Sequence, residues 1–179
     1  MEKRSQIKIA LTYGAMLGLA AVIVYLLFYF MGADPQSKLP GYISYLFTIV
    51  AIVYGVKNYR DQDLNGFITY GRSLGTGVLI GLTSGIISGI FMVLMYTLID
   101  PDLTQKMLDI AQQKMSEKSL TDEQMEMGLK MARKFMSPPF LFIFAVAGTV
   151  FMSFIFSLII SIFIKKEQSP FETPSSGAI

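Results

Sequence analysis

The chain has 179 residues, of which 53% are hydrophobic and only 16% are charged, and its formal net charge is +2. Soluble globular domains carry about 25% charged residues, so this composition indicates a protein whose main solvent is lipid. Cysteine and histidine are both absent, which excludes disulfides, thiolate nucleophiles, imidazole proton relays and metal sites with Cys or His ligands. We therefore expect no bound cofactor, and the small net charge gives no reason to expect a nucleic-acid partner.

Four apolar stretches cover about residues 9–31, 41–56, 74–99 and 140–164. A helix needs about 20 apolar residues to cross a hydrocarbon core of about 30 Å. Three stretches are long enough, and the second, which is shorter, would depend on Lys57 and flanking tyrosines to reach the membrane surface. We predict an all-α polytopic membrane protein with four transmembrane helices in one domain, residues 1–166. A soluble buried helix is the alternative for the second stretch. A cleaved signal peptide is the alternative for the first, whose length disfavours it.

The short connections of the predicted spans differ in their content of lysine and arginine. The positive residues near the two termini and between spans two and three are Lys3, Arg4, Lys8, Lys57, Arg60, Arg72, Lys165 and Lys166, whereas the first connection holds only Lys38. Because loops rich in these residues stay in the cytoplasm, we predict that both termini are cytoplasmic. The loop of residues 100–139 is then on the opposite side of the membrane. This loop holds six more of these residues, balanced by seven acidic residues, so it weakens the bias without reversing it. The segment 167–179, rich in Ser, Pro and Thr, is predicted to be a disordered cytoplasmic tail.

The loop between spans three and four has the pattern of an amphipathic helical hairpin over residues 101–137. Asp100 is a candidate helix cap with Pro101 in the first turn, and Thr121 with Gln124 forms a capping box for a second helix. The apolar face of the second helix is a candidate contact for the membrane or a partner protein. Its residues are Met125, Leu129, Ala132 and Met136.

Small residues recur at every fourth position in three of the four spans. They are Gly14 and Gly18 with Ala10 in the first span, Gly77, Gly81, Gly85 and Gly89 with Ser73 in the third, and Ser153 and Ser157 with Ala145, Thr149 and Ser161 in the fourth. Residues at this spacing share one helix face, where they let another backbone approach closely. We predict that these ridges are helix-packing surfaces, within the chain or between copies. A pore lined by small residues is the alternative.

Two patterns raise the question of a metal. Asp61, Asp63, Asn65 and Gly66 follow the first half of a calcium-binding loop, but Arg72 occupies the twelfth position, where the loop needs a bidentate glutamate. We interpret the segment as an interfacial turn. Methionine is frequent in the 100–139 loop, and its thioether is a possible ligand for monovalent copper. The helical spacing of these methionines favours packing instead, so we predict no metal site.

Several short motifs resemble one known family. They are Tyr-Gly-x-x-x-Gly from Tyr13, Asn58-Tyr59-Arg60, Gly66-Phe67-Ile68-Thr69-Tyr70-Gly71, Asp100-Pro101, Ser137-Pro138-Pro139-Phe140 and Lys165-Lys166. In this order they resemble the domain of unknown function 4199 family, small inner-membrane proteins typical of Bacteroidota. The resemblance implies a four-span protein of the inner membrane, in which the 100–139 loop is periplasmic. It implies no activity, ligand or catalytic residue.

No ionisable residue lies in the middle of any span, which lowers the expectation of ion-coupled transport and leaves no obvious acid or base for catalysis. We therefore expect a non-enzymatic accessory or structural subunit of a larger inner-membrane complex. Its expected partners are membrane lipids and other inner-membrane proteins or a second copy of the chain. The alternative is a small channel or carrier for an uncharged or lipid-like solute, which needs no buried charge.

Overall fold

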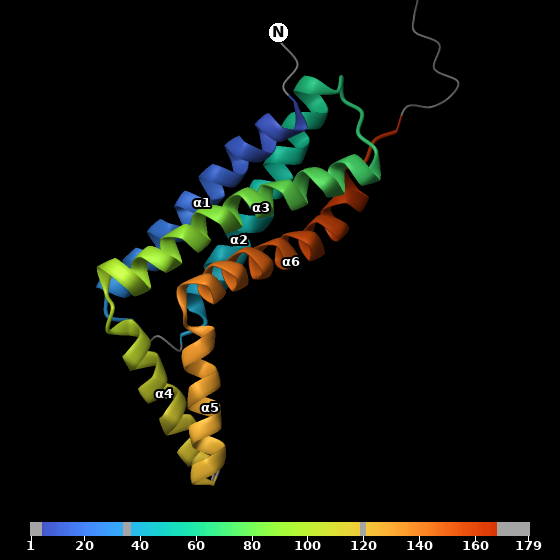
Figure 1. Cartoon of the computed structure of the whole chain (residues 1–179). Coiled ribbons are helices and arrows are strands. Elements are labelled where there is room, and N and C mark those ends of the chain that lie inside the picture. The colour runs from blue at the N-terminus through green and yellow to red at the C-terminus, as the bar shows by residue number, and fades with distance from the viewer. Residues whose placement is uncertain (1–4, 34–36, 119–120, 168–179) are drawn as a thin grey trace, which may run out of the picture.

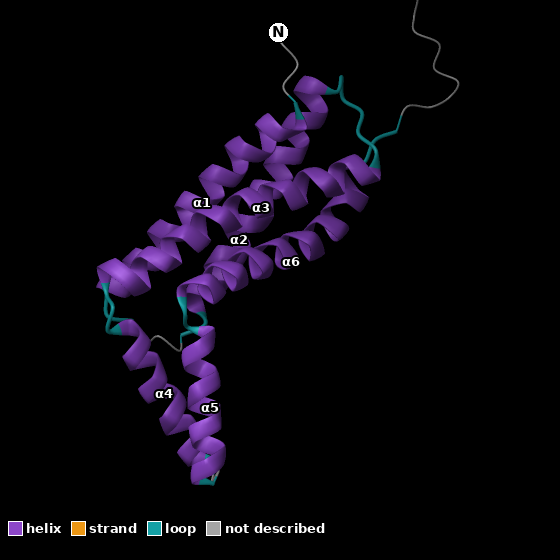
Figure 2. Ribbon diagram, in the orientation of Figure 1, coloured by secondary structure: helices purple, strands orange, loops and turns teal. Residues whose placement is uncertain are grey.

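The computed structural model describes residues 5–33, 37–118 and 121–167, and all the named elements in these ranges are helices (Figure 2). The elements are α1 (Gln6–Phe30), α2 (Leu39–Asn58), the π-helical turn η1 (Tyr59–Asp63), α3 (Tyr70–Leu94), the π-helical turn η2 (Met95–Ile99), α4 (Leu103–Glu117), α5 (Asp122–Phe135) and α6 (Pro138–Ile164). The all-α prediction is confirmed. Apart from Glu167, the predicted disordered tail lies outside the described residues.

Four helical segments are long and apolar enough to cross a membrane: Gln6–Phe30, Leu39–Asp63, Tyr70–Ile99 and Pro138–Ile164. The second is not short, in contrast to the prediction from residues 41–56. It reaches 25 residues because the helix continues past Lys57 and ends in the polar turn η1. Hydropathy identified only the apolar part of this helix, since its last turns carry charged and amide side chains.

The helix α3 is the centre of the bundle. It packs along most of its length against α6 on one side and α1 on the other, while α2 lies behind them and contacts all three (Figure 1). The main buried cluster joins α1, α2 and α3 through Ile9, Ile52, Val56 and Ile80, all of which are fully buried. Both described chain ends lie at one end of the bundle, here named the terminal end. The opposite end, where α4 and α5 project, is named the hairpin end.

Local sequence signals explain several helix boundaries. Thr69 caps α3 by accepting a hydrogen bond from the backbone N–H of Arg72, and Pro138 and Pro139 occupy the first turn of α6, where their lack of an N–H has little cost. Asn65 and Gly66 have φ values of 55° and 85°, which form the predicted turn between η1 and α3. Leucine-, valine- and isoleucine-rich segments between these signals then bury their backbone polar groups within helices, as lipid requires.

The hairpin of α4 and α5 projects from the hairpin end at a steep angle to the bundle (Figure 1). The capping box of Thr121 and Gln124 at the start of α5 is confirmed. The prediction that Asp100 caps the first helix of the hairpin is wrong. The helix α4 begins at Leu103, its cap position is Asp102, and no side chain caps it. The Asp100 carboxylate instead binds residues of α1 and α4, as described below.

Candidate functional site

The ridges of α3 and α6 face one another in antiparallel register. The Oγ atoms of Ser73 and Ser161 lie 2.8 Å apart at the terminal end. Further along, Gly77 faces Ser157, Gly81 faces Ser153, Gly85 faces Val146 and Thr149, and Gly89 faces Phe142. An added Cβ on Gly89 would lie 2.8 Å from Cδ2 of Phe142, closer than van der Waals contact allows. These glycines therefore bring two helices of the same chain into close contact.

The ridge of α1 is also used within the chain. An added Cβ on Gly14 would lie 2.7 Å from the carbonyl oxygen of Ile80, and one on Gly18 would lie 2.9 Å from Cβ of Ile87. Both neighbours belong to α3. The ridge glycines, with Ser153 and Ser157, thus contact another helix of the same chain, and the helices are too close at these points for a pore between them.

Two hydroxyls in the α3–α6 contact lack partners. Ser153 and Ser157 are 0% and 1% exposed, and neither Oγ has a hydrogen-bond partner among the described residues. An unsatisfied buried polar group costs roughly 1–3 kcal/mol. The sequence pattern identified both residues as packing positions. It gave no sign that their hydroxyls are left without partners by the glycines opposite.

The terminal end of the bundle is closed by polar contacts. Arg60 of η1 donates through Nη1 to the carbonyl oxygen of Ile164 at 3.0 Å and also pairs with Asp61. The backbones of Ile68 and Lys166 form an antiparallel bridge, with N–O distances of 2.8 and 3.0 Å. Because these contacts tie the turn after α2 to the end of α6, α2 and α6 are held together at this end.

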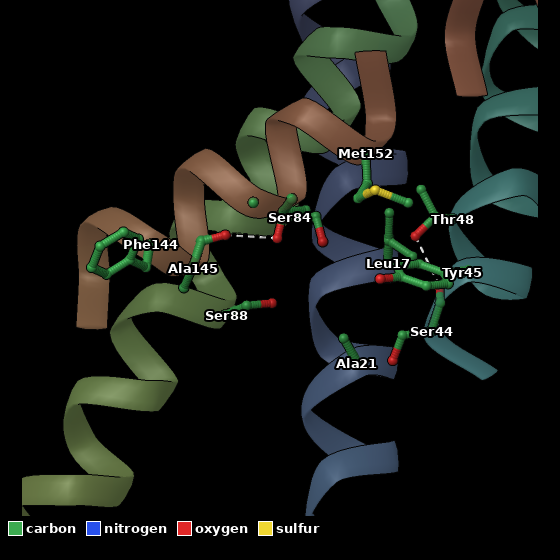
Figure 3. A pocket seen from close by; sticks show the side chains of 12 residues that line it. Leu17, Ala21, Ser44, Tyr45, Thr48, Ser84, Ser88, Phe144, Ala145 and Met152 are labelled. Atoms are coloured by element: carbon green, nitrogen blue, oxygen red, sulfur yellow. Dashed lines mark hydrogen bonds between the residues drawn. The ribbon is translucent and has the colours of Figure 1, made fainter. Parts of the chain in front are cut away.

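A crevice opens between α2 and α6, with α1 and α3 as its floor (Figure 3). It has a volume of about 340 Å³. Half of the described residues that line it are apolar, and none of them is charged. Its walls nevertheless carry hydroxyls on three helices. These come from Ser44, Tyr45, Thr48, Ser84, Ser88 and Thr149.

The crevice continues toward the hairpin end. It shares Ala21, Ser44 and Ser88 with a second hollow of about 250 Å³. That hollow shares Tyr25 and Met92, among others, with a third of about 370 Å³ that reaches α4. The three hollows share lining residues in succession from the middle of the bundle to the base of the hairpin, and we name them together the groove. Sequence reasoning did not identify it, because its lining comes from four helices whose relative positions the sequence did not provide.

A polar cluster joins the hairpin to the bundle near the end of this groove. The Asp100 carboxylate accepts hydrogen bonds from the Tyr29 hydroxyl at 2.8 Å and from Lys106 Nζ at 2.9 Å. These two hydrogen bonds, that of Lys106 first, lower the pKa of Asp100 below its ordinary value. The same carboxylate raises the pKa of Lys106. The cluster is thus an ionised pair at neutral pH, and it fixes the base of α4 against the end of α1.

The predicted contact face of α5 is turned toward the interior of the hairpin. Met125, Leu129, Ala132 and Met136 are half-buried. On the same helix, Gly128 faces the Met115 thioether of α4. The exposed apolar residues of α5 are Met127, Met131 and Phe135, which are 62%, 57% and 47% exposed. We name these three residues the outer stripe.

The outer stripe continues onto α6. Phe135 packs edge-to-face against Phe140 and Phe144, with ring centroids 5.8 and 5.6 Å apart. Phe144 itself is 54% exposed and belongs to a membrane-length helix. One apolar surface therefore runs from the membrane-length part of α6 to the middle of α5. No three carboxylate, His or Cys side chains gather as a metal site within the described ranges.

Comparison with known proteins gives a family and no function. No curated protein matches the chain, and no solved structure matches it. One family model, described as "Protein of unknown function (DUF4199)", matches residues 12–166. This range contains nearly all of the four membrane-length helices and the whole hairpin, in agreement with the resemblance seen in the sequence. The chain therefore belongs to the DUF4199 family of proteins of unknown function.

Proposed function

We propose that the protein is a multi-pass protein of the bacterial inner membrane, with both termini in the cytoplasm and residues 100–139 in the periplasm. The distribution of lysine and arginine supports this orientation. Arg60, Arg72, Lys165 and Lys166 all belong to segments at the terminal end of the bundle. The loop of residues 100–139 holds six lysines and arginines, but its seven acidic residues balance them, so it weakens the bias without reversing it.

Within that membrane we propose a non-enzymatic role, as an accessory or structural subunit that binds another membrane protein. The observation that carries this proposal is the outer stripe and its continuation through Phe135, Phe140 and Phe144. The outer stripe lies outside the membrane-length helices, on a hairpin that projects at a steep angle to the bundle (Figure 1). The membrane surface and a neighbouring protein are the two covers open to it, and we propose the protein. A membrane protein standing beside α6 would cover both parts.

The outer stripe gives a direct test. A tagged chromosomal copy is extracted in mild detergent, and its partners are identified and quantified by mass spectrometry. We expect stoichiometric partners with the native chain and their loss when Met127, Met131 and Phe135 are all replaced by serine. The control variant replaces Glu126 and Lys130, exposed residues of the same helix, by serine and should retain the partners. Recovery of the native chain alone as a monomer would overturn the proposal, and so would partners that the stripe variant retains.

A second candidate is a carrier for an uncharged or lipid-like solute, and the crevice is the observation that favours it. The contacts that close the terminal end of the bundle, including that of Arg60 with Ile164, stand against a continuous path through this conformation. A carrier would have to break these contacts in each cycle. Recovery of a partner-free monomer whose crevice holds a solute would favour the carrier over the subunit.

A further inference from the structure

We propose that the crevice between α2 and α6 binds one neutral lipid-like molecule through a carbonyl group, to which Ser84 and Ser88 donate hydrogen bonds. This inference does not depend on the subunit role, because it is tested at Ser84, Ser88 and Gly148, none of which belongs to the outer stripe. It assigns a ligand class to the crevice.

Three of the hydroxyls in the crevice are hydrogen-bonded within their own helices, and others are not. Ser44, Thr48 and Thr149 donate to carbonyl oxygens one turn earlier in their own helices, at 2.8 Å in each case. Ser84 and Ser88 make no such hydrogen bond to the described residues, although both line the crevice. Ser84 is only 2% exposed. The hydroxyl of Ser88 points into the gap between the helices (Figure 3). Two hydroxyls one helical turn apart, that of the buried Ser84 and that of the half-buried Ser88, are therefore available to an acceptor.

The uncharged lining of the crevice favours a neutral acceptor. None of the described residues lining the crevice is charged, and an ionised ligand buried there would lack a partner of opposite charge. Ser84 is the fifteenth residue of the 30-residue segment Tyr70–Ile99, so it lies near the middle of a membrane-length helix. A neutral carbonyl oxygen accepts hydrogen bonds from two hydroxyls without bringing a charge to this depth. Phe144 and Tyr45 flank the same space (Figure 3) and provide aromatic surfaces beside the carbonyl.

The shape of the groove favours a narrow, chain-like molecule. The groove continues along α1 from Leu17 to Tyr29, a length of about 18 Å at 1.5 Å per residue. A narrow, elongated, mainly apolar groove of this length fits a single alkyl or isoprenoid chain.

Two sources supply this chemistry, and the test separates them. The purified full-length chain, stripped of lipid in detergent, is titrated by native mass spectrometry with ubiquinone-2, a short isoprenoid quinone, and in parallel with monoolein, a fatty ester. We expect saturable binding of one molecule of at least one probe. Preference for the quinone identifies a ring carbonyl as the ligand, and preference for monoolein identifies an ester.

Two variants connect binding to the crevice. Gly148 lines it, and an added Cβ there meets no atom within 4 Å, so Gly148→Phe adds a bulky ring at the crevice without a clash at its Cβ. We expect this variant to lose binding at least tenfold. The matched control Gly71→Phe, also unobstructed but at the start of α3, should bind like the native chain. Ser84→Ala combined with Ser88→Ala should weaken binding by about tenfold, as expected from two neutral hydrogen bonds.

Every variant is also checked for folding, so that a negative binding result can be interpreted. Helix content by circular dichroism and elution as a single species are checked for every variant, so that loss of binding is not mistaken for loss of structure. Failure of both probes to bind the native chain would overturn the proposal. Binding that survives Gly148→Phe would place the ligand elsewhere. Unchanged affinity in the Ser84 and Ser88 double variant would overturn the recognition of a carbonyl.

Discussion

At the scale of single residues, the role of a glycine here depends on what stands opposite to it. Gly81 faces Ser153 on a neighbouring helix, and an added Cβ would overlap with that side chain. Gly71 and Gly148 belong to helices of the same bundle, yet nothing lies within 4 Å of a Cβ added to either. The spacing of glycines identifies a ridge, but only the opposing element decides whether a particular glycine is required.

Gly81→Leu should therefore destabilise the bundle. A larger side chain would push α3 and α6 apart, at a cost of about 1–3 kcal/mol by analogy with overpacked cores. Gly71→Leu is the matched control and should leave stability nearly unchanged. The measurement is thermal unfolding in detergent by circular dichroism. Equal melting temperatures for the two variants would contradict the close contact at Gly81.

Replacing the unpartnered serines by alanine should have the opposite sign. Ser153→Ala and Ser157→Ala each remove a buried hydroxyl that has no hydrogen-bond partner and leave a smaller side chain against the glycine opposite. We expect each variant to be as stable as the native chain or more stable by up to about 1–3 kcal/mol. Ser161→Ala, which removes the partner of Ser73, is the contrasting variant and should lower the melting temperature. A lower melting temperature for Ser157→Ala would show that its hydroxyl makes a stabilising contact.

At the scale of elements, local signals were predictable and long-range ones were not. The capping box of Thr121 and Gln124 lies within four consecutive residues, and the sequence predicted it correctly. Asp100 has an equally suitable local pattern, but its carboxylate binds Tyr29, 71 residues earlier in the chain. Tertiary contact displaced the local cap in this case. The same limit explains α5, where the predicted contact face lies inside the hairpin and the outer stripe is the face left exposed.

The Asp100–Lys106 pair predicts a pH window for the attachment of α4. The pKa of Asp100 is lowered in the folded chain, so its contribution to stability is complete above its unfolded pKa of about 3.9 and is lost as the pH falls through the lowered value. The pKa of Lys106 is raised, so its contribution is complete below about 10.4 and is lost as the pH rises through the raised value. The pair therefore acts in full between about pH 4 and 10.

Asp100→Asn tests this window, because asparagine cannot form the ion pair. The native chain should melt at a higher temperature than the variant at pH 7, and the difference should shrink as the pH falls below about 4. Thermal unfolding of both chains at pH 3 and pH 7 provides the comparison. A difference that is the same at both values would show that the ion pair contributes nothing.

At the scale of the whole molecule, the sequence was sufficient for the four helices, the hairpin and the packing role of the ridges. It was not sufficient for the groove. Ser84 and Ser88 read as ordinary small residues of an apolar helix, and they become candidate ligand contacts only because they line a crevice between α2 and α6. Which helices border that crevice depends on long-range contacts, such as those of Arg60 and Ile68 at the terminal end. Residue composition does not contain that information.

The orientation of the whole molecule in the membrane is the last prediction. Native cysteine is absent, so single cysteines introduced at Lys118 in the hairpin and at Glu167 beyond α6 can be labelled without background. Both positions are exposed, and they lie at opposite ends of the molecule. An impermeant thiol reagent applied to intact spheroplasts should label Lys118→Cys but not Glu167→Cys, and disruption of the membrane should expose both. The opposite pattern in intact spheroplasts would show that the chain is inverted. In that case the outer stripe would meet its partner in the cytoplasm, and the positive residues of the terminal end, such as Arg60 and Lys165, would face the periplasm.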